Sequence, residues 1–100
     1  MIKNGARLRS QVCDTQVIVV RTADSLDELR AGGAPMIPLD EPIDSTLTLD
    51  TDFAAGTQMG KRYVDEAGAE LLVTKAGKGS FSIGTTPLNI KDAKPLPASD

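Results

Sequence analysis

The chain contains two segments that follow the same order of features, and this repeat constrains the fold more than any other part of the sequence. Each copy begins with glycine, a spacer, arginine and a large residue. It continues with an apolar stretch and ends in a glycine-containing bend before proline and a large apolar residue. The first copy comprises residues 5–8, 17–20 and 29–36, and the second comprises residues 60–63, 71–74 and 81–88. This pattern predicts that the chain builds one supersecondary unit twice.

Each copy is too short to hold a hydrophobic core of its own. The chain has 100 residues, the length of one domain. Halves of about 30–35 residues are smaller than units that usually fold without disulfides, metals or a partner. We therefore expect one compact all-β domain made of two similar small β-hairpin lobes packed together. The first lobe is residues 1–38 and the second is residues 60–90.

Residues 39–59 join the two lobes and differ from them in charge. This connector contains five acidic residues and no lysine or arginine. Polar and apolar residues alternate over residues 45–49, as in a half-buried strand, so we expect the connector to be partly strand. Residues 91–100, which include Pro95 and Pro97, are expected to form an extended tail.

Two segments also allow a helical interpretation. Ser25 followed by Glu28 is a capping-box pattern, which favours a short helix at 25–31. Apolar residues at every fourth position favour a second helix at 59–72, although each of its two glycines would cost about 1 kcal/mol there. An α+β fold with these two helices is the alternative to the all-β fold.

The second copy resembles the desulforedoxin family of small β-modules, which are related to rubredoxin. The resemblance rests on Gly60-Lys-Arg-Tyr63, two turn positions three residues apart, a strand at 70–74, a glycine-rich hairpin loop, a strand at 80–83 and a bend to Leu88. Members of this family bind one iron or zinc ion through four cysteines. The resemblance therefore implies an internally duplicated β-module derived from a metal-binding scaffold.

The residues at the four ligand positions depart from the family pattern. The resemblance places these positions at Asp65, Gly68, Ile83 and Gly84 in the second copy, and at Ser10 or a neighbour, Cys13, Ala31 and Gly32 in the first. A tetrathiolate site needs four sulfur ligands, whereas this chain has one cysteine and no histidine. We therefore expect that the metal-binding cysteines have been lost and that no cofactor is bound. Packing of one lobe on the other would replace stabilisation by the metal.

Cys13 and four basic residues are the candidate site residues. As a reactive thiol, Cys13 would need a nearby cation or helix N-terminus to lower its pKa, and Asp14 beside it acts in the opposite direction. A half-buried structural cysteine is the alternative interpretation. The candidate contacts for a partner are Lys61, Arg62, Lys75 and Lys78.

Composition narrows the classes of function. The net charge is −3 and no basic cluster is present, which argues against nucleic-acid binding. No stretch has the length of a membrane span, and the N-terminus lacks the pattern of a signal peptide, so we expect a cytoplasmic protein. Because the chain has no histidine, it lacks the commonest general base and the usual nucleophile pairs, and we assign no catalytic residue.

These observations predict a non-catalytic binding or structural protein, or an accessory subunit. We expect it to bind a protein partner or itself, as a homodimer or a larger oligomer. Two alternatives remain open. One is a small redox or metal-binding protein whose site lies between subunits and uses Cys13. The other is an enzyme with a carboxylate or Cys13 site at a dimer interface.

Overall fold

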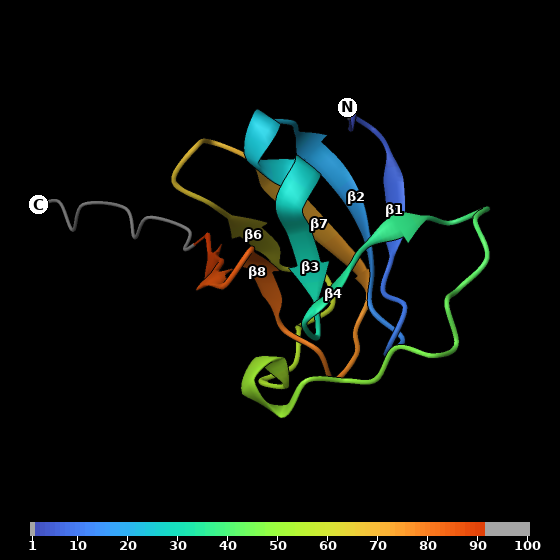
Figure 1. The fold of residues 1–100 in the computed structure, drawn as a ribbon. Helices are drawn as coiled ribbons and strands as arrows, with labels where there is room; N and C mark the ends of the chain where they lie inside the picture. The colour runs from blue at the N-terminus through green and yellow to red at the C-terminus, as the bar shows by residue number, and fades with distance from the viewer. Residues whose placement is uncertain (1, 92–100) are drawn as a thin grey trace, which may run out of the picture.

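The structure is a computed structural model that describes residues 2–91, and it confirms the all-β prediction (Figure 1). In chain order the strands are β1 (Arg7–Arg9), β2 (Gln16–Arg21), β3 (Leu29–Ala31), β4 (Ala34–Pro35), β5 (Ile37–Pro38), β6 (Arg62–Val64), β7 (Glu70–Lys75), β8 (Phe81–Ile83), β9 (Thr86–Pro87) and β10 (Asn89–Ile90). Within the described range they form two antiparallel sheets. The six-stranded sheet has the order β10-β6-β7-β2-β1-β5, and the four-stranded sheet has the order β4-β3-β8-β9.

Neither helix of the alternative α+β fold forms. In the first segment, Asp24–Glu28 makes a 3₁₀ turn, η1, which places Leu26 in the core before the chain enters β3. In the second segment, residues 59–72 contain β6 and the start of β7. Gly60 and Gly68 have φ values of +80° and +95° there. This left-handed conformation ends a right-handed helix, and glycine adopts it without strain.

The core lies between the two sheets. Successive residues of a strand point to opposite faces, so alternate positions of the central strands β2 and β7 turn inward. The inward-facing and almost fully buried residues are Val17, Val19, Leu71 and Val73. Tyr63 on β6 and Phe81 on β8 pack edge to face, with ring centroids 5.0 Å apart, and so connect the two sheets.

The chain crosses from the six-stranded to the four-stranded sheet after β2 and after β7, and it returns after β4 and after β9. β7 pairs with β6 and β2, whereas β8 pairs with β3 and β9. The hairpin expected between residues 70–74 and 80–83 is therefore wrong, because residues 76–80 carry the chain between the sheets. The β2–β7 and β3–β8 pairs lie at the centres of the two sheets. The two halves of the chain therefore meet strand to strand and share both sheets.

The strands before the connector correspond in order to the strands after it, so β1 to β5 match β6 to β10. Under this match the strand order of each sheet is symmetric about its centre. β1 pairs with β2 and β5 in the same register in which β6 pairs with β7 and β10. Matched backbone hydrogen bonds run from Gly5 to Val19 and from Gly60 to Val73, and from Met36 to Leu29 and from Leu88 to Phe81. We call residues 2–39 the first half and residues 60–91 the second half.

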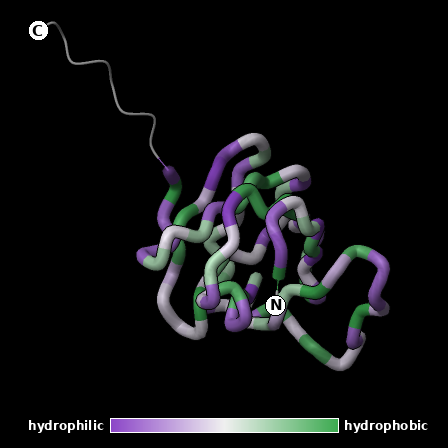
Figure 2. The backbone as a smooth tube through the Cα atoms, turned by 90° about the horizontal axis from the view of Figure 1, so that it is seen from above, coloured by the Kyte–Doolittle hydropathy of each residue, from purple (hydrophilic) through white to green (hydrophobic). Residues whose placement is uncertain are grey.

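The connector leaves β5, projects from one side of the molecule and returns beneath the sheets (green in Figure 1; Figure 2). The strand expected at residues 45–49 is absent, because this alternating stretch has no neighbouring strand with which to pair. The connector is instead held at separate points. The N–H of Asp50 donates to Gly32 O over 2.9 Å. The Asp50 carboxylate then caps a second 3₁₀ turn, η2 (Thr51–Phe53).

Two expectations from the sequence concern the remainder of the chain. Residues 92–100, most of the predicted tail, lie outside the described residues. Within residues 2–91, no helix has the length and hydrophobicity required to cross a membrane.

Candidate functional site

Two turns, one in each half, each contain two of the four positions that the family resemblance assigns to metal ligands in that half. The first turn joins β1 to β2, and the N–H of Ser10 donates to Thr15 O over 2.9 Å. The second turn joins β6 to β7, and the N–H of Asp65 donates to Ala69 O over 3.1 Å. Each turn is therefore closed by a backbone hydrogen bond, with four residues between the bonded residues in the first turn and three in the second.

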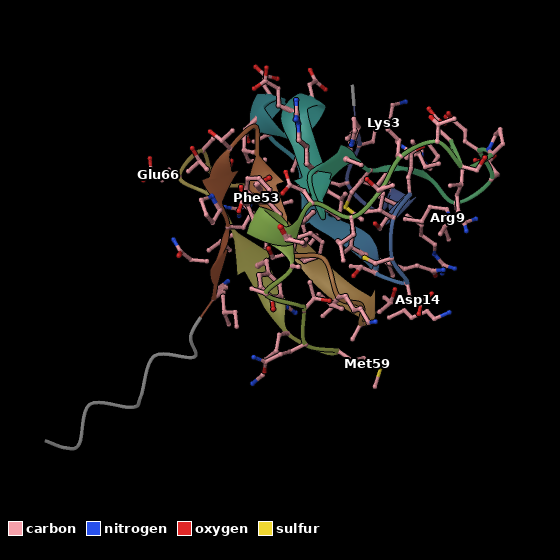
Figure 3. All side chains as sticks on the ribbon, turned by 60° about the horizontal axis from the view of Figure 1, so that its bottom comes forward. Lys3, Arg9, Asp14, Phe53, Met59 and Glu66 are labelled. Carbon is pink, nitrogen blue, oxygen red and sulfur yellow. The ribbon has the colours of Figure 1, made fainter. Side chains whose placement is uncertain are left out.

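Each turn lies near the bend that follows β3 or β8. We define the first site as residues 10–13 with Ala31 and Gly32, and the second site as residues 65–68 with Ile83 and Gly84. The labels Asp14 and Glu66 in Figure 3 mark the two turns on opposite sides of the molecule. The two sites are therefore parts of separate surfaces, and each is described in turn below.

In the first site, the Ser10 side chain accepts hydrogen bonds from the backbone of its own turn. Its Oγ accepts hydrogen bonds from the N–H of Val12 over 3.1 Å and from the N–H of Cys13 over 3.2 Å. Ser10 itself is buried. The hydroxyl thus satisfies two backbone donors that would otherwise lack a partner, which is the condition for burying them at little cost.

Cys13 is half-buried and lies within hydrogen-bond distance of two groups. Its Sγ lies 3.3 Å from Thr15 Oγ1 and accepts from the N–H of Gly79 over 3.4 Å. Burial raises the pKa of the thiol, whereas its hydrogen bonds with Ser10, with Thr15 and with the Gly79 N–H lower it, and the pKa lies below its ordinary value. Hydrogen bonds therefore lower the pKa of Cys13, an effect that the sequence led us to expect only from a nearby cation or helix N-terminus.

Hydroxyl groups continue from Cys13 to the connector. Thr15 Oγ1 lies 3.3 Å from Thr57 Oγ1, which in turn accepts from the N–H of Gly77 over 3.1 Å. Thr57 belongs to the end of the connector and Gly77 to the loop after β7. The first site is therefore joined to both segments by polar contacts.

The connector also covers the first site from outside. A Cβ placed on Gly32 would lie 2.6 Å from Leu49 Cδ1 and 2.7 Å from Val12 Cγ2. Such distances are too short for real carbon atoms, so the Leu49 and Val12 side chains already occupy this space. Gln11 completes the cover, because its amide donates to Pro35 O over 2.8 Å and accepts from the Asp44 N–H over 3.0 Å.

The residues at the two sites do not fit a four-sulfur metal centre. The first site offers one sulfur, on Cys13, and the second offers two carboxylates, on Asp65 and Glu66, but no sulfur. The Asp65 carboxylate accepts from the N–H of Ala69 over 2.8 Å and so closes its own turn. Within residues 2–91, no three histidine, cysteine, aspartate or glutamate side chains are grouped to hold a metal ion.

The second site differs from the first because nothing from the described part of the chain covers it. It opens into a hollow of about 300 Å³ between the turn and β9. The residues that line this hollow are Asp65, Glu66, Ala67, Ile83, Thr86, Pro87, Leu88 and Asn89. A Cβ placed on Gly84 would find its nearest neighbour, Glu28 Oε2, only at 3.7 Å. The bend of the second half therefore lacks the tight packing seen at Gly32.

One substitution between the halves explains part of this difference. Gln11 spans the first site by donating its amide hydrogen to Pro35 O. Glu66 occupies the corresponding position in the second half, opposite Pro87. An ionised carboxylate has no hydrogen to donate, so Glu66 is unable to make the equivalent bond to a carbonyl oxygen. The gap between the second turn and β9 therefore stays open.

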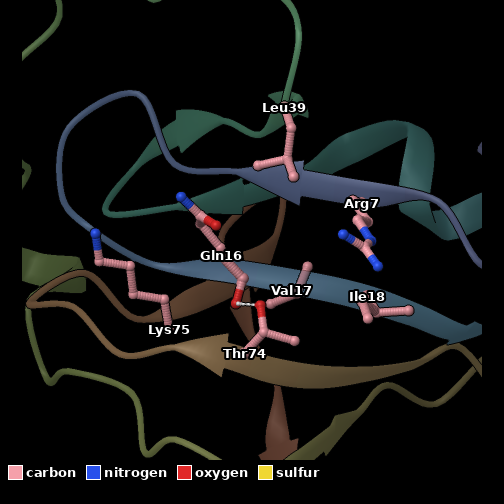
Figure 4. Close-up of a pocket in the computed structure, with 7 residues that line it drawn as sticks. All are labelled: Arg7, Gln16, Val17, Ile18, Leu39, Thr74 and Lys75. Carbon is pink, nitrogen blue, oxygen red and sulfur yellow. Dashed lines mark hydrogen bonds between the residues drawn. The ribbon is translucent and has the colours of Figure 1, made fainter.

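The four basic candidate residues do not form a single cluster. Arg62 donates to Glu70 Oε2 over 2.9 Å, within the six-stranded sheet. Lys61 precedes β6, and Lys78 lies in the loop between the sheets. Lys75, at the end of β7, lines a hollow of about 360 Å³ together with Arg7, which the sequence analysis did not single out (Figure 4).

Comparison with known proteins identifies no relative of this chain. No family model matches it, and no curated protein and no solved structure matches it either.

Proposed function

We propose that this chain is a non-catalytic binding protein or accessory subunit, built on an internally duplicated desulforedoxin-like scaffold that has lost its metal ligands. The observation that carries the proposal is the contrast between the two sites. The first is filled by the chain's own connector, whereas the second is an open hollow of about 300 Å³. In this proposal the second site is where a partner binds.

The use of the former ligand positions supports a scaffold without metal. Ser10 and Asp65 stand at the first ligand position of each half, and both accept backbone hydrogen bonds of their own turns. Ala31, Gly32, Ile83 and Gly84 have no side-chain atom that binds a metal. Stabilisation comes instead from the strands that the two halves share at the centre of each sheet.

The first site indicates what kind of segment the second site accepts. There an extended stretch of chain lays an aliphatic side chain, Leu49, against the glycine bend. The open hollow offers aliphatic walls from Ile83 and Leu88 and two acidic groups, Asp65 and Glu66, with no basic residue. We therefore propose a partner segment that carries an aliphatic side chain next to a lysine or arginine.

Self-association stays a prediction, and the structure favours sheet faces over sheet edges for it. The four edge strands, β4, β5, β9 and β10, have two residues each. Three of them contain a proline, namely Pro35, Pro38 and Pro87. Short edges with proline resist pairing with another strand. A cytoplasmic location also stays a prediction.

The metal part of the proposal is tested by elemental analysis of protein purified without an affinity tag. We expect no stoichiometric iron or zinc and the same melting temperature with and without EDTA. One equivalent of either metal per chain, or per pair of chains, lost together with stability when EDTA is added, would contradict the proposal.

The partner part is tested with two neighbouring threonines. Thr86 lines the hollow and Thr85 does not, although both are exposed. Thr86→Arg should abolish co-purification of a partner, because the added cation repels the basic segment and occupies the hollow. Thr85→Arg should leave it intact. Proteins captured equally by both variants would show that the hollow is not the binding site.

Cys13 supports a second candidate function, thiol chemistry. The specific observation is that its hydrogen bonds outweigh burial and hold its pKa below the ordinary value. If this chemistry operates, the rate of alkylation by iodoacetamide should rise with pH around a midpoint below that of free cysteine. A midpoint at or above that of free cysteine would count against the candidate, with Cys13→Ser as the control for background labelling.

A further inference from the structure

The outer face of the six-stranded sheet contains a buried carboxylate in the second half. Glu70 is buried, and its two oxygens bind Arg62 Nη1 over 2.9 Å and Lys91 Nζ over 3.0 Å. A hydrogen bond to Lys91 lowers the pKa of Glu70, burial raises it, and the bond to Arg62 lowers it further, so that the pKa lies below its ordinary value. On this face, the second half therefore contains both the cations, Arg62 and Lys91, and the carboxylate of Glu70 that pairs with them.

The first half has the cation at the corresponding place but lacks the anion. Arg7 matches Arg62 in register, because each lies opposite the third residue of the neighbouring central strand. Gln16 stands where the second half has Glu70, and Leu39 stands where it has Lys91. Among the described residues, Arg7 forms no ion pair.

A second cation faces the same place from β7. The register of β2 against β7 shifts between Gln16 and Val17, so that Lys75 lies directly opposite Gln16 and Thr74 is the extra residue. A bulge of this kind redirects the side chains beside it. The Thr74 hydroxyl donates to Gln16 O over 3.2 Å and fixes the bulge.

These residues surround a hollow of about 360 Å³. Its lining consists of Arg7, Gln16, Val17, Ile18, Leu39, Thr74 and Lys75, and none of these residues is acidic. Figure 4 shows Arg7 and Lys75 at the two ends of the hollow, with Gln16 between them. The hollow therefore combines two positive charges and an amide donor, and the described residues that line it supply no negative charge to balance them.

We infer that this hollow binds an oxyanion, a carboxylate or a phosphate, which takes the place that the Glu70 carboxylate occupies in the second half. The Arg7 guanidinium presents paired donors that match the two oxygens of such a group. Lys75 adds a second charge, and the Gln16 amide adds a neutral donor. Both cations are exposed, so binding of a small free anion should be weak and should decrease as salt is added.

This inference goes beyond the proposed function and does not depend on it. The anion hollow and the open second site share no lining residue. The same oxyanion chemistry comes from two sources, a small free anion or an acidic side chain of a partner protein. The experiment distinguishes between them.

The test is an amide chemical-shift titration of the full chain with three probes. These are sodium phosphate, sodium succinate and a tetraglutamate peptide with an amidated C-terminus, each compared with sodium chloride at equal ionic strength. We expect saturable shifts at the amides of Arg7, Gln16, Ile18 and Thr74. Tighter binding of the peptide than of either small anion indicates a partner's carboxylate as the source, and the reverse order indicates a free anion.

Three variants make the test specific. Arg7→Gln should weaken binding about tenfold or more, because it removes a charge-assisted hydrogen bond. Gln16→Glu places the missing carboxylate inside the chain, so it should abolish binding of added anions and raise the melting temperature. Arg30→Gln removes an exposed arginine of the four-stranded sheet that does not line the hollow, and this variant should bind as the unaltered chain does.

Two results would overturn the inference. One is the absence of saturable shifts for all three probes. The other is binding that is equally strong in the unaltered chain, in Arg7→Gln and in Gln16→Glu. The dispersion of the amide spectrum shows for each variant that the chain is folded, so a loss of binding is not confused with a loss of structure.

Discussion

The first and second halves contain the same strands in the same register, yet their corresponding surfaces differ in how much of them the chain itself covers. Ser10, Ala31 and Gly32 are buried in the first half. Their counterparts Asp65, Ile83 and Gly84 are partly exposed. The connector accounts for the contrast, since it passes over the first site and nothing equivalent within the described residues passes over the second.

The outer face of the six-stranded sheet shows the opposite asymmetry. Here the second half is complete, because Glu70 binds both Arg62 and Lys91. The first half is incomplete among residues 2–91, because Gln16 stands in the place of Glu70 and no described carboxylate pairs with Arg7. Each half therefore has one of these two places filled by the chain itself and the other left as a hollow. The first half has its glycine bend covered, and the second half has its arginine paired with a carboxylate. In our proposal, two halves with the same strand order thus present two different binding surfaces, because a few side chains differ and the connector covers only one half.

The largest effect should come from adding a methyl group at the glycine of each bend. Gly32 and Gly84 have similar φ values of +64° and +59°, so alanine meets the same backbone strain of about 1–2 kcal/mol at both. Only at Gly32 does the new methyl group also collide with Leu49 and Val12, which adds about 1–3 kcal/mol. Gly32→Ala should therefore destabilise the chain more than Gly84→Ala in urea unfolding. Equal losses of stability would show that the first site is not closed.

A smaller effect should follow from exchanging the amide and the carboxylate. Gln11→Glu removes the hydrogen-bond donor to Pro35 O and should cost about 0.5–1.5 kcal/mol. Glu66→Gln gives the second half an amide that is able to reach toward Pro87, so it should not destabilise the chain. Urea unfolding of both variants checks this pair. A larger loss for Glu66→Gln than for Gln11→Glu would contradict our explanation of the open hollow.

The smallest effect should be the acid dependence that Glu70 contributes. The folded state lowers the pKa of Glu70, so its contribution to stability is present above the pKa of the unfolded chain and is lost as the pH falls through the folded value. Glu70→Gln should therefore lower the melting temperature at neutral pH and have progressively less effect in acid. Melting curves of both chains from neutral pH to pH values below the ordinary glutamate pKa test this. A difference that does not shrink in acid would show that the carboxylate charge is not responsible.

The sequence was sufficient for the fold class, because glycines recur at the same places beside apolar stretches of strand length. Gly5 and Gly60 both precede the first strand of their half, and both have positive φ. The sequence was not sufficient to show which strands share a sheet. The glycine-rich loop at 76–80 has the composition of a hairpin turn, yet it carries the chain from one sheet to the other. Alternation at residues 45–49 predicted a strand, but a strand also needs a neighbour.

The site residues were harder to predict, because their partners lie far away in the sequence. The Gly79 N–H that binds Cys13 comes from a residue 66 positions later. Arg7 was overlooked because it stands in no basic cluster. The signal that identifies it is the repeat itself, in which Arg7 aligns with Arg62 while Gln16 takes the place of Glu70. The differences between the two halves at matched positions therefore point to the hollow beside Arg7, which no cluster of charges in the sequence marks.

The most direct test of the account is a solution NMR structure of the full chain, with Leu49, Gly32 and Val12 assigned. We predict nuclear Overhauser effects from the Leu49 methyl groups to the Gly32 Hα and to Val12, together with matching cross-strand contacts in the two halves. We also predict no comparable contact from the connector to Gly84. Two results would contradict our account, in which both halves have the same strand register and the connector covers the glycine bend of the first half alone. One is a Leu49 side chain that contacts neither residue, and the other is a different strand register in the two halves.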